Sequence, residues 1–94
     1  MVLTIKFIGA LRHITGKTQL TINFEKEMSL KELLARISQE MPKLEKSFSD
    51  QQNGDSTSNA LILVNGREIS VLEGLQTKLS DGDEIVFVPV VHGG

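Results

Sequence analysis

The residues best suited to chemistry lie in the last segment of the sequence, Val91-His92-Gly93-Gly94. Glycine has no Cβ and adopts backbone conformations that other residues avoid, so a Gly-Gly segment can enter a narrow channel in another protein. The carboxylate of Gly94 is then the reactive group. A carboxylate is a poor electrophile because its leaving group would be oxide, and adenylation by ATP is the usual cellular way to activate it. We therefore expect Gly93 and Gly94 to be the substrate of a separate activating enzyme.

The remaining polar residues do not form an active site or a metal centre by their spacing. Cysteine is absent, which excludes disulfides, thiolate ligands and a cysteine nucleophile. His13 and His92 are the only histidines, and no paired carboxylates accompany them at metal-ligand spacing. We interpret His13 as a solvated loop residue. For His92 two interpretations stay open, an exposed side chain or one that shapes recognition of the tail.

The segment Gly16-Lys17-Thr18 looks like the end of a phosphate-binding loop but does not complete one. Such a loop needs Gly-x-x-x-x-Gly-Lys-[Ser/Thr] between a strand and a helix. Leu11 stands where the first glycine should be, and Gly9 lies two residues too early. We therefore expect no bound cofactor and no enzymatic activity, with ATP used only by the partner activating enzyme.

Length, charge and composition favour one small globular domain. The chain has 94 residues, a net charge of -2 and no basic block, so nucleic-acid binding lacks electrostatic support. Four Phe without Trp or Tyr offer no platform for stacked bases. The longest apolar run, 85–91, is far shorter than the roughly 20 residues of a membrane span. We expect a cytoplasmic protein that is soluble and monomeric alone, without a nucleic-acid or membrane partner.

The strands and the helix that position the tail are predicted from the spacing of apolar residues, which is two residues in a strand and 3.6 in a helix. Alternating apolar and polar residues predict strands over 2–8 and 18–24, joined by a loop with room for one helical turn. A period of 3.6 residues predicts one helix over 29–41. Ser29 and Glu32 have the spacing of a capping box, and Pro42 disfavours continuation of the helix.

The second half of the chain is predicted to consist mainly of strands. A strand over 60–64 leads into Asn65-Gly66, a strong hairpin signal, and then into a short return strand near 68–70. Residues 72–79 are expected to be irregular. The last strand is expected over 84–90.

This order of elements predicts an α+β domain in two layers, because one helix covers only one face of a sheet. The mixed sheet has four to five strands packed on one main helix. The first and last strands lie side by side and parallel at its centre, since a crossover containing the helix connects them. The domain spans 1–90, with a mobile loop at 49–59, a stretch that holds no apolar residue, and a flexible tail at 91–94.

The sheet face turned away from the helix is predicted to carry apolar side chains. If Ile85 and Phe87 point inward, their neighbours in the strand point outward. The residues predicted on this outer face are Ile8, Leu63, Val86 and Val88. They are either scattered surface residues, which are common, or a docking patch for the activating enzyme and the downstream partner. We favour the docking patch, with Arg12 and Arg67 as rim charges.

Two segments resemble the MoaD/ThiS family of sulfur carriers. One is Leu3–Gly9 with Ala10–Gly16 after it. The other is Leu79–Gly94, with its Asp-Gly-Asp-Glu turn, a proline in the last strand and the final Gly-Gly. These features are specific only in combination. The family includes the small subunit of molybdopterin synthase, and the ubiquitin-related modifier and the small archaeal modifier proteins are close relatives. The resemblance implies a ubiquitin-like β-grasp fold.

The resemblance also implies a function for Gly94. A ubiquitin-activating-type enzyme adenylates its carboxylate, a sulfur donor displaces AMP, and the resulting thiocarboxylate gives its sulfur to a molybdopterin precursor or a tRNA base. The implied further partners are the large subunit of molybdopterin synthase or a tRNA-thiolation enzyme. In the modifier branch, a lysine amine of a target protein attacks instead and an isopeptide bond forms. The sequence does not separate these branches, because both use the same activated tail.

Overall fold

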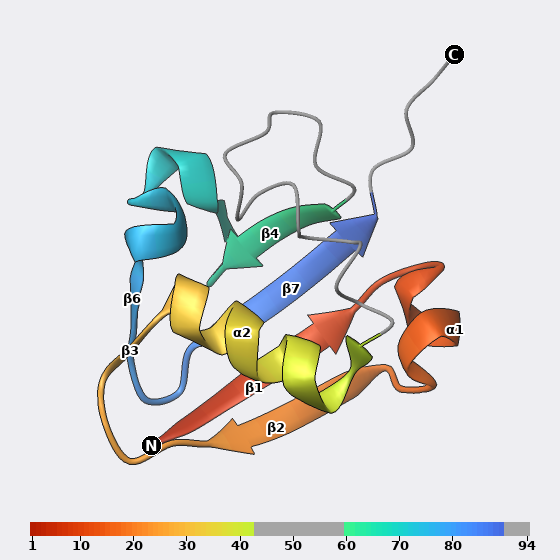
Figure 1. The fold of residues 1–94 in the computed structure, drawn as a ribbon. Helices are drawn as coiled ribbons and strands as arrows, with labels where there is room; N and C mark the ends of the chain where they lie inside the picture. Colours follow the sequence, from red (N-terminus) through yellow and green to blue (C-terminus); the bar gives the residue numbers. More distant parts are fainter. Residues whose placement is uncertain (43–59, 90–94) are drawn as a thin grey trace.

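The computed structural model describes residues 1–42 and 60–89, and its largest unit is a five-stranded mixed sheet (Figure 1). The strands of this sheet are β1 (Val2–Phe7), β2 (Gln19–Asn23), β4 (Ala60–Val64), β5 (Arg67–Glu68) and β7 (Glu84–Pro89). Their order is β2-β1-β7-β4-β5. The first and last strands, β1 and β7, are parallel neighbours at the centre, as the sequence predicted, and every other pair is antiparallel.

Helix α2 (Leu30–Glu40) crosses one face of the sheet (Figure 1). The predicted capping box at its start is confirmed. The Ser29 hydroxyl accepts the Glu32 N–H at 3.2 Å, and the Glu32 carboxylate accepts the Ser29 N–H at 3.3 Å. These bonds satisfy two donors that the first helical turn would otherwise leave without partners. The helix ends at Glu40, and its C-cap Met41 directly precedes Pro42.

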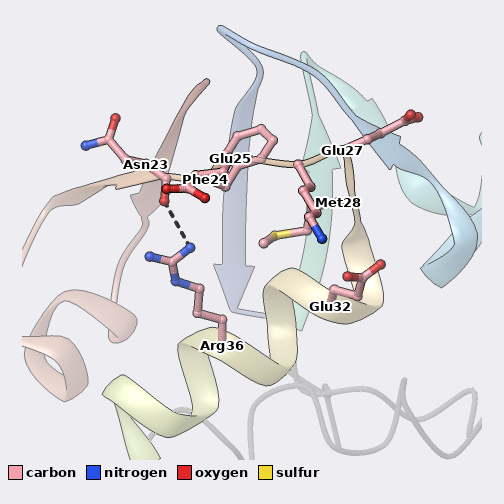
Figure 2. Close-up of a pocket in the computed structure, with 8 residues that line it drawn as sticks. Asn23, Phe24, Glu25, Glu27, Met28, Glu32 and Arg36 are labelled. Carbon is pink, nitrogen blue, oxygen red and sulfur yellow. Dashed lines mark hydrogen bonds between the residues drawn. The ribbon is translucent and has the colours of Figure 1, made fainter.

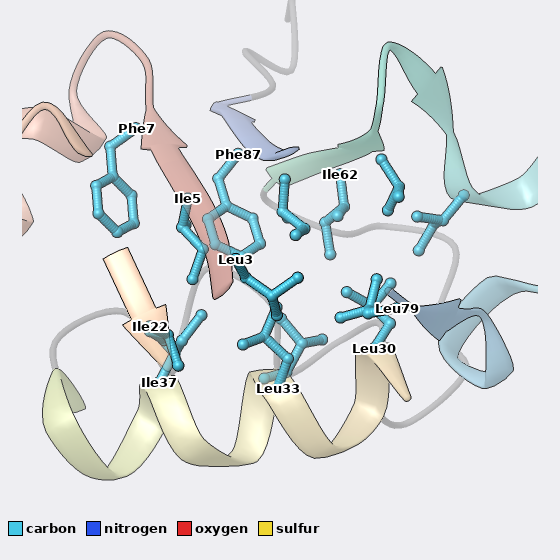
Figure 3. Packing of buried hydrophobic residues seen from close by; sticks show 14 of the residues in the cluster. Leu3, Ile5, Phe7, Ile22, Leu30, Leu33, Ile37, Ile62, Leu79 and Phe87 are labelled. Carbon is cyan, nitrogen blue, oxygen red and sulfur yellow. The ribbon is translucent and has the colours of Figure 1, made fainter. Parts of the chain in front are cut away.

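The core lies between α2 and the inner face of the sheet (Figure 3). Strand residues Leu3, Ile5 and Phe87 are fully or almost fully buried, and they face Leu33 and Ile37 of the helix. The rings of Phe7 and Phe87 stack with their centroids 5.9 Å apart, which links the two central strands. Alternate residues of each strand therefore bury against the 3.6-residue stripe of one helix.

Two turns hold the start of β7 to its neighbours. Asn65, in the left-handed region at φ 52°, and Gly66, at φ 83°, form the predicted hairpin turn between β4 and β5. The Asn65 carboxamide donates to the Asp83 carboxylate and accepts the Glu84 N–H, both at 2.9 Å. The Asp81 carboxylate accepts the Val2 N–H at 2.6 Å. The start of β7 is thus joined to both of the strands that flank it.

The structure corrects the predicted return strand. Strand β5 contains only Arg67 and Glu68, and the chain then enters the 3-10 helix η2 (Ile69–Val71) where a strand near 68–70 was expected. The cause is local, because the Glu68 carboxylate accepts the Ser70 N–H at 2.6 Å and caps the 3-10 turn. A hydrophobic pattern does not predict a hydrogen bond between a side chain and the backbone such as this one.

Short elements are also present where the sequence predicted a loop or irregular chain. Helix α1 (Leu11–Thr15) occupies the loop after β1. The region expected to be irregular contains the 3-10 helix η3 (Gly74–Gln76) and β6 (Lys78–Leu79), which pairs with β3 (Met28–Ser29) in a second, two-stranded sheet. Two residues are too few to show a period. The predicted loop 49–59, the tail 91–94 and Val90 lie outside the described residues.

Candidate functional site

The central strand β7 carries the chain toward the predicted tail. The Ile8 N–H donates to the Phe87 carbonyl at 3.1 Å, which places the backbone of Phe87 toward β1. The next bond of a parallel ladder would be donated by the N–H of residue 89. Pro89 has no N–H, so this ladder stops at the end of β7. The predicted site residues His92, Gly93 and Gly94 follow this end and lie outside the described residues.

The outer face of the sheet carries the predicted apolar residues close together. No helix covers this face in residues 1–42 and 60–89 (Figure 1). Val86 lies opposite Leu63 in the pairing of β7 with β4, and Ile8 continues the outward alternation of β1. All four predicted residues are half-buried. The structure thus brings Ile8, Leu63, Val86 and Val88 to one face, next to the end of β7.

Leu61 is a member of this surface that sequence reasoning missed. It lies directly opposite Val88 in the register and is 37% exposed. Its position two residues before Leu63 in the same strand was the available signal, because alternate residues of a strand share a face. The name outer patch is used below for the set Ile8, Leu61, Leu63, Val86 and Val88.

Polar residues border the outer patch, but they differ from those expected. The Lys6 ammonium lies 3.1 Å from the Glu84 carboxylate, and both side chains are nearly half exposed. Arg67 was predicted as a rim charge, and this is wrong, because it lies opposite the inward-facing Val64. Glu68 lies opposite Leu63 and borders the outer patch instead. The cause is the alternation of a strand, which sends neighbouring residues to opposite faces.

The region around α1 does not form a nucleotide site. Gly16 is the C-cap of α1 with φ 71°, and strand β2 follows it, whereas a phosphate-binding loop leads into a helix. His13 is exposed on α1, in agreement with its interpretation as a solvated residue. Arg12, the other predicted rim charge, donates from Nε to the Phe7 carbonyl at 3.0 Å and so fastens α1 to the end of β1.

One shallow hollow of the described surface lies far from the end of β7. It lies between α2 and the segment that follows β2, and Figure 2 shows Arg36 reaching the Asn23 carbonyl across it. This bond is 3.0 Å long. Asn23 pairs with Val2, at the end of the sheet where β1 begins, whereas Pro89 lies at the opposite end. The hollow therefore has no part in presenting the tail.

The described part of the chain carries neither a metal centre nor a membrane-spanning helix. Three or more histidine, aspartate or glutamate side chains arranged to hold a metal ion do not occur among residues 1–42 and 60–89. Over the same residues, the helices are all too short or too polar to cross a membrane.

Comparisons with known proteins agree with this geometry. The model of the ThiS family matches residues 5–94. A protein of Archaeoglobus fulgidus described as a candidate sulfur carrier is 40% identical over 76 residues, which are 80% of this chain and 83% of the relative. The solution structure of small archaeal modifier protein 1 from Methanosarcina acetivorans is 31% identical, with a TM-score of 0.75 over 99% of this chain and 96% of that one.

A third likeness is to a protein solved within an assembly. A chain in the complex of subunits 1 and 2 of the molybdopterin-converting factor from Helicobacter pylori is 26% identical, with a TM-score of 0.64 over the whole of both chains. The fold is therefore shared with these solved structures, and the family match extends to residue 94.

Proposed function

Because this chain belongs to the ThiS family, we propose that the Gly94 carboxylate is the group on which it carries sulfur. As a carrier protein of this family, the chain is not itself an enzyme. The observation that supports the role of Gly94 most is that the family match extends through the tail to residue 94. The described residues add a rigid domain whose central strand leads toward that tail.

The proposed chemistry has two steps, both performed by a ubiquitin-activating-type partner. A Gly94 carboxylate oxygen attacks the α-phosphate of ATP, pyrophosphate leaves, and an acyl adenylate forms. Hydrosulfide from a sulfide donor then attacks the acyl carbon, the C–O bond to AMP breaks, and loss of the proton on sulfur leaves a thiocarboxylate on Gly94. Gly93 has no side chain to shield the reacting carbon.

We propose that the outer patch docks the activating enzyme and then the acceptor of the sulfur. An uncovered face with five apolar side chains beside the start of the tail would place a partner's catalytic groups near the carboxylate. The likeness to a subunit of the H. pylori complex supports such a docked state. We propose the molybdopterin synthase large subunit or a tRNA-thiolation enzyme as acceptor. ATP is supplied in the cytoplasm, which is the compartment we propose.

The second candidate function is that of a protein modifier, which the likeness to the M. acetivorans modifier favours. In that role a lysine Nζ of a target attacks the activated carbonyl of Gly94, and an isopeptide bond replaces the bond to AMP. The same outer patch and the same tail serve both roles. They differ only in the nucleophile that the partner brings to the carbonyl.

Intact mass spectrometry tests the proposal. We expect the chain, incubated with its activating enzyme, ATP and a sulfide donor, to gain the mass of one sulfur in exchange for one oxygen. The matched control lacks Gly93 and Gly94 and should stay unchanged. If the full chain also stays unchanged while the enzyme activates a known substrate, the sulfur-carrier role is excluded.

A separate measurement decides on the modifier role. We expect tagged full-length chain in cells of its host to form a ladder of conjugates that is missing from the variant without Gly93 and Gly94. A ladder that persists in this variant, or no ladder at all, contradicts the modifier role and leaves the mass measurement to decide on sulfur transfer.

A further inference from the structure

The end of β7 packs against a glycine of a different segment. Gly9 follows β1 and has φ +59°, a left-handed conformation that side chains other than those of Gly, Asn and Asp rarely allow. A Cβ at Gly9 would lie 3.2 Å from Cγ and 3.8 Å from Cδ of Pro89. The shorter distance is tighter than ordinary van der Waals contact. The ring of Pro89 therefore occupies space that is free only because residue 9 has no side chain.

Gly9 is held from both directions. The Ile8 N–H before it donates to the Phe87 carbonyl at 3.1 Å, which ties it to β7. The Arg12 N–H after it donates to the Gly9 carbonyl at 3.0 Å, which ties it to α1. A Cβ at residue 9 would consequently press on the ring of Pro89, which must shift by a few tenths of an ångström to make room.

Pro89 is held on its other side as well. It pairs with Ala60 of β4, and its nitrogen, which faces β1, has no N–H to donate. Packing against Gly9 thus takes the place of the missing ladder bond between β1 and β7. These contacts leave one position for the last residue of the strand.

We propose that Gly9 is a positioning residue for the tail, because its bare backbone seats the Pro89 ring and thereby sets the direction in which the chain continues toward Gly94. This inference rests on the proposed function and assigns a role to a residue far from the tail in sequence. Gly9 does not touch the reacting atoms. Its effect is on the alignment of the carboxylate after the domain has docked.

The test compares Gly9→Asn with Gly16→Asn. Both glycines have left-handed φ values, 59° and 71°, and asparagine tolerates this region better than other residues with a Cβ. Among the described residues, a Cβ at Gly16 would have no neighbour within 4 Å. The two variants share any backbone effect, and only Gly9→Asn crowds Pro89.

The first readout is steady-state adenylation of the full chain by its activating enzyme. Since the outer patch is unchanged, we expect KM within about twofold of wild type for both variants. We expect kcat to fall roughly tenfold for Gly9→Asn and to stay unchanged for Gly16→Asn, because small misplacements of a reacting group lower its rate steeply. Equal kcat values, or a higher KM with unchanged kcat, would overturn the positioning role.

The second readout is the NMR spectrum of the free chain, supported by kcat, and it does not depend on the folding of a crowded variant. Pro89→Ala removes the ring while Gly9 stays, and it also supplies an N–H that faces β1. We expect its amide resonances for residues 91–94 to shift in NMR spectra, because the last strand residue no longer packs against Gly9. Adding Gly9→Asn to Pro89→Ala should change neither these resonances nor kcat further, because both act through one contact. Additive effects, or unshifted resonances, would overturn the inference. If wild type is not adenylated but the resonances respond as expected, the proposed function fails and the positioning contact stands.

Discussion

Asn65 is the residue whose single side chain joins two turns of the fold. Its carboxamide donates to the Asp83 carboxylate and accepts the Glu84 N–H. Its own N–H donates to the Glu84 carbonyl at 2.8 Å, while its backbone adopts the left-handed conformation that the hairpin turn requires. Hydrogen bonding and backbone conformation therefore both favour asparagine at this position.

We expect Asn65→Asp to lower the free energy of unfolding by about 1–2 kcal/mol, because it removes a donor and places a carboxylate beside that of Asp83. Urea denaturation at neutral pH measures the loss. Asn65→Gly is the matched control, since it keeps the turn conformation and removes both side-chain bonds without adding charge. High salt should reduce the difference in the free energy of unfolding between the two variants, because it screens the repulsion between carboxylates. If Asn65→Asp is as stable as wild type, the side-chain hydrogen bonds of Asn65 do not stabilise the fold.

At Val88, a substitution can weaken docking of a partner without reducing the stability of the fold. It is half-buried on the outer patch, opposite Leu61, and its side chain points away from the core. We expect Val88→Asp to raise KM for adenylation at least tenfold, because a partner would then bury an unpaired charge. Circular dichroism should show an intact fold.

The control for Val88→Asp is Thr21→Asp on β2, an exposed strand residue outside the outer patch. It introduces the same charge and should leave KM unchanged. An equal effect of the two substitutions would show that charge anywhere on the sheet disturbs activation, and the outer patch would lose its assigned role.

At the scale of elements, both ends of helix α2 are set by residues at or next to them. The Ser29–Glu32 capping box starts it, and Pro42 follows its end. We expect Ser29→Ala to lower the free energy of unfolding by about 1 kcal/mol. Gln39→Ala, an exposed change in the last turn, is the control and should have little effect. Thermal or urea unfolding distinguishes them, and equal losses would mean that the capping bonds do not stabilise the helix.

The sequence predicted those elements that have a hydrophobic pattern of several residues or a specific turn dipeptide. Alternation identified β1 and β2, continuous apolar runs identified β4 and β7, and Asn65-Gly66 identified the hairpin turn. Strands β3 and β6 were not predicted, because two residues contain no period. One helical turn was allowed in the loop where α1 lies, but its bounds were not predicted, because Leu11 is the only buried residue of α1. These elements form through contacts between distant segments, which no local pattern records.

Only part of the candidate site was predicted, because some of its contacts also depend on how distant segments pair. Strand alternation placed Val86 and Val88 correctly, and the same rule applied to β4 would have added Leu61. Arg67 was misplaced because its pairing with the inward-facing Val64, which decides the face it takes, was not known from the sequence. The Gly9–Pro89 contact required the parallel register of β1 and β7, which composition and spacing do not specify.

At the scale of the whole molecule, the core and the tail are separate in the sequence. Every core residue among the described ranges precedes Pro89, and the last is Phe87. We expect deletion of Gly93 and Gly94 to leave the urea unfolding midpoint unchanged while adenylation is lost. A lower midpoint for the deleted chain would contradict this separation, and the control is wild type measured in the same buffer.

The central place of β7 has a consequence for biosynthesis. A growing chain on the ribosome can form the β1–β2 hairpin and α2 early, but the gap between β1 and β4 stays unfilled until residues 84–89 have emerged. Synthesis of the tail directly follows the strand that closes this gap. A truncated or misfolded product would therefore lack an assembled outer patch, and an activating enzyme that binds there would reject it without any dedicated surveillance step.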